Sequence, residues 1–326
     1  MNPIRRWLFA IFIASLIFPA VTSAQTWPDK PVHMTMPFPP GTGPDIVMRT
    51  VSERLAKMWK QPVLVENKPG GNGFIAMSAA KRAPADGYTL VMVDYGIMTV
   101  LPYLFPKTIP YDPVKDFDAV APMYWAYWFV AVAGDSRFTK IPDLVAEANA
   151  KNGTMTYGSS GVGSPMHLQA AMLENATGTH MSHIPYKETP QVLIDISRHD
   201  IGWAFTTGAT GGGMAKGGKI KFLAVASPKR HPGFPDVPTM AEAGGPKDFD
   251  LRTWVGLYAP HGVPKPILDK ISADVATVLS DPEVKDLLVA NGLEAWPGPA
   301  SELVKQQAED SKKYGELTSK LKISLD

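Results

Sequence analysis

Residues 37–45 constrain this chain most strongly, because their prolines and glycines separate two segments with different periodicity. The stretch reads Pro-Phe-Pro-Pro-Gly-Thr-Gly-Pro-Asp. An apolar segment before it, residues 32–38, predicts a strand. The segment after it predicts a helix with one apolar face, formed by Val47, Val51, Leu55 and Met58. Pro44 suits the first helical position, and Gly41 and Gly43 allow backbone geometry that a side chain would obstruct.

A loop of this kind can turn backbone N–H groups toward a ligand. The start of a helix carries partial positive charge and unpaired N–H donors, so it stabilises a carboxylate or phosphate without a lysine or arginine. Nucleotide-binding interpretations fail, because the loop lacks the third glycine of a dinucleotide fingerprint and the Gly-Lys-Ser/Thr ending of a P-loop. The remaining alternative to an anion site is an ordinary turn that binds nothing.

A second stretch repeats this organisation with different residues. Residues 154–157 predict a strand, residues 158–165 a loop that reads Gly-Ser-Ser-Gly-Val-Gly-Ser-Pro, and residues 166–175 a helix. Two strand-loop-helix units of the same kind can grip an anion at both ends if they face each other across a cleft. The repetition therefore favours an anion site over an ordinary turn.

The second loop also has the residues that begin a helix. Ser164 suits the N-cap and Pro165 the first helical position, which leaves Ser159, Ser160 and the glycine amides to face a ligand. A hydrolase motif of the form Gly-x-Ser-x-Gly is not matched, because Val162 stands where the last glycine belongs. A serine nucleophile is therefore only weakly supported.

The N-terminus has the pattern of a secretory signal peptide. Two arginines precede an apolar run over residues 7–21, and residues 22–24 place small side chains where a signal peptidase reads. We expect residues 1–24 to be removed and the mature chain to begin at Gln25. An uncleaved anchor is the alternative, but the run is shorter than the ~20 apolar residues that span a bilayer.

Composition excludes several classes of protein. The sequence has no cysteine, which rules out disulfides, a lipidated cysteine, a thiol nucleophile and cysteine metal sites. The formal net charge of +1 becomes −1 when Arg5 and Arg6 are removed, which gives no support for nucleic-acid binding. A mature chain of roughly 300 residues favours two domains and a core large enough to be stable without disulfides.

Strand and helix patterns alternate after the first loop. Residues 62–66 and 88–93 predict strands, residues 67–73 a glycine-rich loop and residues 74–82 a helix. This order indicates a parallel sheet with right-handed crossovers and ligands at the carboxyl ends of its strands. Residues 100–120 are predicted to form a loop.

The rest of the chain continues the alternation. Predicted strands cover residues 183–186, 201–205, 220–226 and 254–259, and predicted helices cover 190–197, most of 266–291, and 301–320. Residues 208–218 are predicted to form a glycine-rich connector. Residues 123–133 are the densest aromatic stretch, and we expect a strand in their second half. Packing in the core or hinge is favoured for these aromatic residues over an apolar wall that contacts a ligand.

The sequence contains no constellation of nucleophile, base and orienting group, so we predict neither an enzyme nor a cofactor. His180 and His183 are separated by two residues without a nearby acid, and we expect no metal site. Asp45 is expected to favour the helix start electrostatically, with direct ligand contact as the alternative. His167 is expected either to hydrogen-bond its loop or to touch the ligand.

Motifs along the chain carry a resemblance to a known family. They are Trp27-Pro-Asp-Lys-Pro-Val32, Pro37-Phe-Pro-Pro-Gly41 with Asp45-Ile-Val, Val65-Glu-Asn-Lys-Pro-Gly-Gly71, Asp86-Gly-Tyr-Thr-Leu90, Tyr111-Asp-Pro-Val-Lys-Asp-Phe117, Tyr157-Gly-Ser-Ser-Gly-Val-Gly-Ser-Pro165 with His167-Leu168, Pro185-Tyr-Lys187, Leu223-Ala-Val, and Pro235-Asp-Val-Pro-Thr239 with Ala241-Glu-Ala-Gly244. Each motif is weak alone, but their order is specific. The sequence resembles the tripartite tricarboxylate transporter substrate-binding receptors, the Bug family of bacterial periplasmic proteins, over nearly all of the mature chain.

The resemblance implies an α/β fold of two domains, the Venus-flytrap fold of periplasmic binding proteins, with mostly parallel sheets flanked by helices and a ligand cleft between the domains. Domain 1 would comprise residues 25–122 and 250–326, and domain 2 residues 123–249. The two loops would bind a carboxylate through backbone amides and ordered water. The candidate ligand-binding residues are Phe38, Gly41, Thr42, Gly43, Asp45, Ser159, Ser160, Gly161, Gly163, Ser164, His167, Tyr186 and Thr206.

Four positions depart from the family pattern. The family usually has glycine where Thr42 and Glu188 stand, Thr or Ser at Pro44, and Asp or a similar polar residue near Thr206. Loss of an acid near Thr206 argues against recognition of an amino group. Together with the aromatic stretch, this favours an aromatic or apolar carboxylic acid, and an aliphatic dicarboxylic acid is the nearest competitor.

The expected function is that of a monomeric periplasmic receptor. It would close on a small organic carboxylate and deliver it to the permease subunits of a tripartite transporter in the membrane, without nucleic acid or cofactor. One alternative is a periplasmic sensor that presents its ligand to a signalling kinase. A second alternative is a secreted hydrolase that uses Ser160 with His167.

Overall fold

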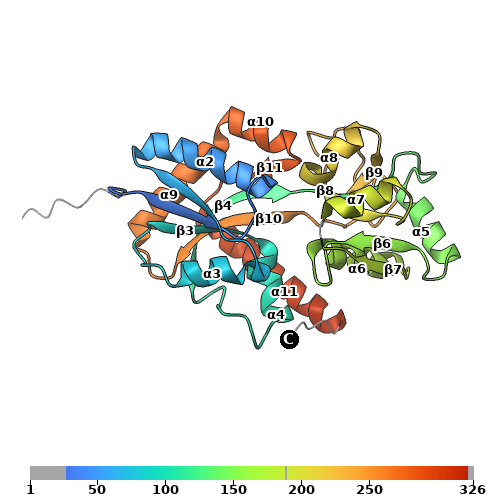
Figure 1. Ribbon diagram of the computed structural model, residues 1–326, viewed down its shortest axis with the longest axis horizontal. Helices are drawn as coiled ribbons and strands as arrows, with labels where there is room; N and C mark the ends of the chain where they lie inside the picture. The colour runs from blue at the N-terminus through green and yellow to red at the C-terminus, as the bar shows by residue number, and fades with distance from the viewer. Residues whose placement is uncertain (1–26, 188, 322–326) are drawn as a thin grey trace, which may run out of the picture.

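The computed structural model describes residues 27–187 and 189–321, which form two lobes (Figure 1). The predicted signal peptide, residues 1–24, and the departure at Glu188 lie outside the described residues. The strands are β1 Val32–Met36, β2 Val63–Asn67, β3 Thr89–Asp94, β4 Phe117–Ala126, β5 Trp128–Ala133, β6 Thr156–Ser159, β7 Ser182–Pro185, β8 Ala204–Thr207, β9 Ile220–Val225, β10 Thr253–Pro260 and β11 Leu293–Ala295.

The helices lie between and around these strands. They are α2 Gly43–Trp59, α3 Phe74–Lys81, α4 Leu101–Leu104, α5 Ile141–Ala150, α6 Pro165–Thr177, α7 Thr189–Ser197, α8 Gly208–Lys216, α9 Lys265–Ser280, α10 Pro282–Ala290 and α11 Ala300–Leu321, with a 3-10 turn η1 at Gly71–Gly73 and a π-helix η2 at Gly96–Val100. Within the described ranges, none of these helices combines the length and apolar character needed to cross a membrane.

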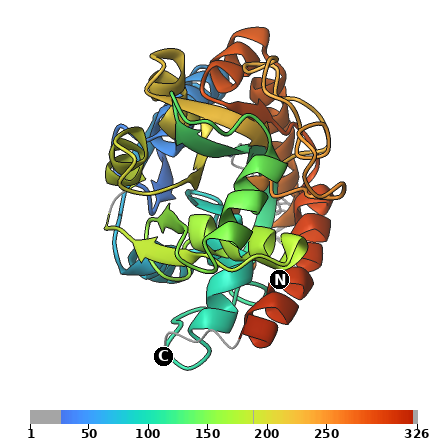
Figure 2. The same cartoon turned by 90° about the vertical axis from the view of Figure 1, so that its right-hand side faces the viewer.

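The first lobe is built on a six-stranded sheet in the order β11-β4-β10-β3-β1-β2, with strands from both ends of the chain. Its middle strands are buried on both faces, as in β10, where all eight residues are buried. One face packs on α2 and α9 through residues such as Met34, Leu55 and Ile271. The other face packs on α3 and α11, and α11 is the red helix at the lower right of Figure 2. Tyr314 of α11 contacts Tyr95 at a centroid distance of 5.2 Å.

The second lobe contains a three-stranded sheet, β8-β5-β9, and a parallel pair, β6-β7. The two sheets share one core, in which Tyr157 of β6 packs near Trp203, just before β8. Their ring centroids lie 5.6 Å apart. The predicted domain boundary at residue 122 lies inside β4, which continues to Ala126 in the first sheet. The boundaries of the two domains therefore stay a prediction.

The expectation of mostly parallel sheets is wrong. Parallel pairing joins β1 to β2, β1 to β3, and β6 to β7, whereas β10 is antiparallel to β3 and β4, β11 to β4, and β5 to β8 and β9. For β4 and β10 the cause is that the chain runs toward the second lobe along β4 and returns from it along β10. Alternating helices and strands predict parallel pairing only where the helix between two strands brings the chain back to the start of the same sheet.

The glycine-rich connector predicted at residues 208–218 is instead helix α8. Thr207 caps it, since the Thr207 hydroxyl accepts a hydrogen bond from the Thr210 N–H at 3.3 Å. Glycine is required by close packing: a Cβ on Gly211 would lie 2.8 Å from the Thr206 side chain, and one on Gly212 would lie 2.9 Å from the Phe234 ring. Tertiary packing therefore overrides the low helix propensity of glycine here.

The loop predicted at residues 100–120 is also wrong in part. This segment contains α4 and the first residues of β4, and the π-helix η2 precedes it. Apolar residues of η2 and α4 are buried, including Met98, Val100 and Leu104. The predicted strand in the second half of the aromatic stretch is confirmed as β5, but β4 occupies the first half and was missed.

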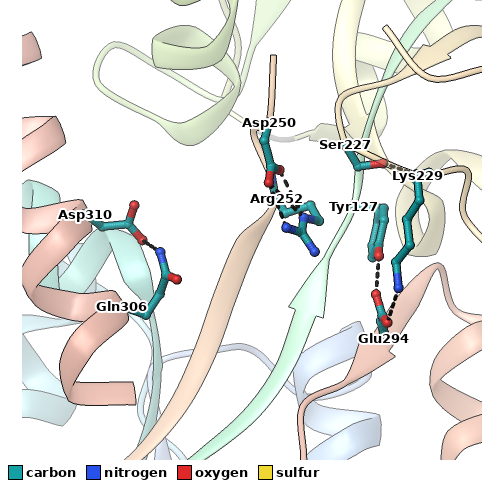
Figure 3. Close-up of polar contacts among 8 residues, drawn as sticks. All are labelled: Tyr127, Ser227, Lys229, Asp250, Arg252, Glu294, Gln306 and Asp310. Atoms are coloured by element: carbon teal, nitrogen blue, oxygen red, sulfur yellow. Dashed lines mark hydrogen bonds and ion pairs between the residues drawn. The ribbon is translucent and has the colours of Figure 1, made fainter. Parts of the chain in front are cut away.

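Polar contacts gather where the chain passes between the lobes (Figure 3). Tyr127, between β4 and β5, donates its hydroxyl to Glu294 of β11, and Lys229 Nζ of the second lobe lies 2.8 Å from Glu294 Oε1. Arg252, just before β10, pairs with Asp250 at 2.7 Å and lies 5.0 Å from the ring of Trp125. Both crossing segments are thus held to the first lobe by specific contacts.

Candidate ligand-binding site

A cleft of about 350 Å³ lies between the two lobes. Its lining comes from four segments, residues 37–38, 70–73, 94–105 and 160–168. These segments directly follow β1, β2, β3 and β6, so the cleft lies at the carboxyl ends of parallel strands. That is where ligand sites occur in α/β sheets.

The cleft has an apolar wall and a few polar groups. The wall comes mainly from η2, α4 and α6, through Ile97, Val100, Leu101, Leu104, Phe105 and Leu168. The polar side chains of the lining belong to Asn72, Asp94, Tyr95, Ser160 and Ser164. In the part of the chain that the structure describes, no lysine, arginine or histidine lines this cleft. An anion here would be held by backbone dipoles and uncharged groups.

Asp45 organises the first loop from inside. Its buried carboxylate accepts hydrogen bonds from the Gly41 N–H at 2.9 Å and from Asn67 Nδ2 at 2.8 Å. Arg49, one turn further along α2, pairs with it at 3.0 Å. The same Asn67 amide also donates to the Phe38 carbonyl at 3.0 Å. Asp45 therefore shapes the loop through contacts within the protein, and its electrostatic effect on the helix start stays a prediction.

The charge of Asp45 is strongly favoured by these partners. Burial raises the pKa of Asp45, but hydrogen bonds from Arg49, the Gly41 N–H and Asn67 outweigh it and lower the pKa to about 2. The unfolded carboxyl binds a proton near pH 3.8, so this contribution to stability is present above that pH. It is lost as the pH falls through 2.

Substituting Asp45 with alanine should lower the free energy of unfolding by about 2 kcal/mol, because three donors lose a buried acceptor. The first loop should also lose its shape, and ligand affinity should fall. Chemical denaturation measures the first effect. Glu53→Ala on the same helix is the matched control, since Glu53 pairs with Lys57 at the same spacing but on the exposed surface. The control should cost less than about 0.5 kcal/mol; equal losses would contradict the assigned role of Asp45.

The helix that follows the first loop begins one residue earlier than the sequence predicts, because Gly43 is its first residue and Pro44 its second. Thr42 is the N-cap of α2 and Pro44 lies in its first turn. Among the residues described, the N–H groups of Gly43 and Asp45 have no protein acceptor, so this helix start can still bind an anion. A Cβ on Gly43 would lie 3.5 Å from Ala209 Cβ, which places the start of α2 against the start of α8 in the other lobe.

The second loop is held from behind by two stacked histidines. Ser159 is fully buried, and its hydroxyl oxygen lies 2.6 Å from His183 Nε2 and accepts from the Gly161 N–H at 3.1 Å. His167 accepts a hydrogen bond from the Gly163 N–H on Nδ1 at 3.0 Å. The rings of His167 and His183 stack at 4.1 Å. Of the two expectations for His167, the structure shows the hydrogen bond to the loop.

The second helix start confirms the predicted capping residues. The Ser164 hydroxyl accepts from the His167 N–H at 3.4 Å, and Pro165 is the first residue of α6. Gly161 and Gly163 have positive φ values of 116° and 78°. Only glycine adopts such backbone conformations without strain, which explains two glycines in this loop.

The structure brings together part of the predicted site. Four predicted residues line the cleft: Phe38, Ser160, Gly163 and Ser164. Others support the loops from beside or behind it: Gly41, Thr42, Gly43, Asp45, Ser159, Gly161 and His167. That these residues bind a ligand stays a prediction.

Two predicted residues lie away from the cleft lining. The Tyr186 hydroxyl donates to Asp195 Oδ2 at 2.7 Å. Thr206 is fully buried in β8, and its hydroxyl has no hydrogen-bond partner among the residues described. Its side chain lies against Gly211 of α8, so this position packs the helix against its strand. Thr206 thus lies outside the cleft lining, and its role in ligand binding stays a prediction.

The sequence analysis missed the part of the cleft lining that lies at the ends of β2 and β3. Asn72, Asp94 and Tyr95 line the cleft but were not among the predicted site residues. The signal for them was present, because both strands were predicted and ligands bind beyond the carboxyl ends of such strands. Residues 100–120 were predicted as loop, and the apolar residues between 100 and 105 were therefore not assigned to a wall.

The sequence model of the protein family described as tripartite tricarboxylate transporter family receptor matches residues 47–323 of this chain. The chain belongs to this receptor family. A UPF0065 protein of Bordetella bronchiseptica is 34% identical over 298 residues, covering 90% of this chain and 86% of that protein.

Solved structures show the same architecture. The R. palustris protein Rpa4515, solved with adipate, has a TM-score of 0.80 at 27% identity, with 90% of the receptor and 97% of that chain covered. MatC from Rhodopseudomonas palustris, solved with bound malate, has a TM-score of 0.76 at 25% identity, with 89% of the receptor and 99% of that chain covered. The two-domain periplasmic-binding fold predicted for the receptor is confirmed.

Proposed function

We propose that this receptor captures a small organic carboxylate in the cleft between its lobes and delivers it to the membrane permease of a tripartite transporter. The observation that carries the proposal is the cleft itself, which is lined by the segments after β1, β2, β3 and β6 and bordered by the start of α6. Relatives with the same fold were solved with adipate and with malate.

Backbone donors supply the attraction for a carboxylate. Residues 160–164 border the cleft at the start of α6, and the N–H groups of Ser160 and Val162 have no acceptor within the described segments. A helix start adds partial positive charge at the same place. A lysine or arginine is not needed, because backbone N–H groups that point at the anion donate hydrogen bonds to it.

The apolar wall selects the body of the ligand. Aliphatic residues of η2 and α4 together with Phe38 and Phe105 offer contact to a hydrocarbon chain or ring. This supports the preference for an aromatic or dicarboxylic acid over a small, fully polar one. Burial of such a body contributes roughly 25 cal/mol per Å² of apolar surface.

Closure links binding to delivery. We propose that residues 25–122 with 250–326 move against residues 123–249 about the two crossing segments at Tyr127 and Arg252. A ligand that contacts both lobes stabilises the closed arrangement by its differential affinity for that arrangement. The permease would recognise the closed receptor in the periplasm, after removal of residues 1–24, and the receptor would act as a monomer.

A thermal-shift screen tests the proposal. The protein lacking residues 1–24 is mixed with aliphatic and aromatic monocarboxylates and dicarboxylates, and with amino acids. A ligand at about 100 times its dissociation constant should add about 2.7 kcal/mol, which raises the melting temperature by several degrees. Nucleotides and neutral sugars serve as controls and should produce no shift. The absence of a shift with every acid would refute carboxylate binding.

The two alternatives differ in their support. A hydrolase needs a base beside Ser160, but the two stacked histidines are engaged elsewhere, His167 with Gly163 and His183 with Ser159. A sensor would bind the same ligand in the same cleft. Growth on the identified acid as sole carbon source, with and without the permease genes, separates the sensor from the transport receptor.

A further inference from the structure

Asp94 is a carboxylate in the wall of a cleft proposed to bind carboxylates. It is the last residue of β3 and lines the cleft on the side of the first lobe. Its Oδ1 accepts a hydrogen bond from the Ile97 N–H at 3.0 Å, at the start of the η2 segment. This bond fixes the carboxyl group at the rim of the apolar wall.

Among the residues that the structure describes, no cation pairs with Asp94. Its hydrogen-bond donors are backbone N–H groups of Gly96 and Ile97, and no lysine, arginine or histidine in residues 27–187 and 189–321 forms an ion pair with it. Of the lining residues described, it alone has a carboxyl group. Burial raises the pKa of Asp94 above its usual value, and the buried Tyr124 has its own pKa raised by burial and by Asp94. The Asp94 carboxyl therefore acts electrostatically on Tyr124.

A ligand carboxylate has a better place on the opposite side of the cleft. The start of α6 with Ser160 and Ser164 belongs to the second lobe, whereas Asp94 belongs to the first. A ligand bound by one end at α6 presents its other end to the wall that contains Asp94. A second carboxylate there would meet a like charge in a partly desolvated site, which is strongly unfavourable.

We propose that Asp94 is a specificity-determining residue that selects carboxylic acids whose far end carries a hydrogen-bond donor, a hydroxyl or an ammonium group, and that rejects a second carboxylate. This inference rests on the proposed function and narrows its ligand class, because it excludes the dicarboxylic acids that the apolar wall alone would accept. It also revises the argument drawn from Thr206, because an acid able to receive an amino group is present in the cleft at a different position.

Isothermal titration with two matched ligand series tests the inference. One series is hexanoate, 6-hydroxyhexanoate, 6-aminohexanoate and adipate, in which only the far end changes. The other is 4-methylbenzoate, 4-(hydroxymethyl)benzoate, 4-(aminomethyl)benzoate and terephthalate. Each is titrated into the wild-type protein, Asp94→Asn, and Asp286→Asn, a control that removes the same charge from an exposed position on α10.

For the wild type and the control, we expect the better of the two series to bind with the donor-ended acid at least about tenfold tighter than the dicarboxylate. Asp94→Asn should reduce that ratio to within about threefold, mainly because the dicarboxylate gains affinity. A wild-type protein that binds the dicarboxylate tightest would overturn the inference without any variant. An unchanged ratio in a folded Asp94→Asn protein would also overturn it.

The two levels of the proposal fail in distinguishable ways. If carboxylates bind but their order does not depend on Asp94, the inference is wrong and the receptor function stands. If no acid of either series and no acid of the thermal-shift screen binds to any of the three proteins, the proposed function is refuted and the inference with it. Circular dichroism of each protein establishes that the comparison is made on folded chains.

Discussion

Replacing Gly163 with valine is expected to weaken carboxylate binding by at least about a hundredfold while the receptor stays folded. Gly163 lines the cleft with a φ of 78°, a conformation that strongly disfavours β-branched residues. Its N–H also donates to His167 Nδ1, so a shifted backbone at this position disturbs the whole second loop. Titration calorimetry with the tightest acid from the thermal-shift screen measures the loss.

Gly178 provides the matched control for backbone strain. It ends the same helix, α6, with a φ of 66°, and a Cβ at this position would meet no atom within 4 Å. Gly178→Val should therefore cost roughly 1–2 kcal/mol of stability, as Gly163→Val should, but it should leave ligand affinity unchanged. Wild-type affinity in Gly163→Val, or an equal loss of affinity in Gly178→Val, would mean that the second loop does not form the anion site.

Acidification to pH 4 is expected to cost roughly 1–2 kcal/mol of stability through His183 alone, because solvent screens part of the effect at this half-buried ring. Burial, and then the neighbouring His167, lower the pKa of His183 from 6.5 to about 4. The unfolded imidazole therefore binds a proton below pH 6.5, whereas the folded one stays neutral until about pH 4. Stability is fully present above pH 6.5 and falls as the pH decreases through that window.

Urea denaturation at pH 7.5 and pH 4 measures this effect as a difference between proteins. In His183→Gln the amide can still contact the Ser159 hydroxyl, and the pH-dependent loss should shrink by most of that amount. His180→Gln is the control, because the His180 side chain is 90% exposed only three residues away. If all three proteins lose the same free energy between the two pH values, the neutral buried imidazole is not the cause.

Features that depend on neighbouring residues could be read directly from the sequence. Pro44 and Pro165 in the first turns of their helices, and Ser164 as an N-cap, follow from backbone rules that act within a few residues. The glycine at position 163 follows from the same rules, since its positive φ is set by the loop itself. Both loops and both helix starts were predicted for this reason.

Features that depend on distant segments needed the tertiary structure. Helix α8 forms from a glycine-rich segment because its glycines fit closely against Thr206 and Phe234. The antiparallel direction of β10 depends on where the chain re-enters the first lobe, about 130 residues after β4. Neither contact leaves a local periodicity that a sequence pattern can show.

The candidate site likewise has features that depend on neighbouring residues and features that depend on distant segments. The sequence by itself determined the two glycine loops that border the cleft, because turn and cap preferences are short-range. The tertiary structure decided that Asp94 lines the cleft and that Thr206 does not, because the lining of a cleft is set by how sheets and lobes pack. Tertiary packing decides which charged groups come together at a site and how deeply they are buried, and the order of residues along the chain does not show this.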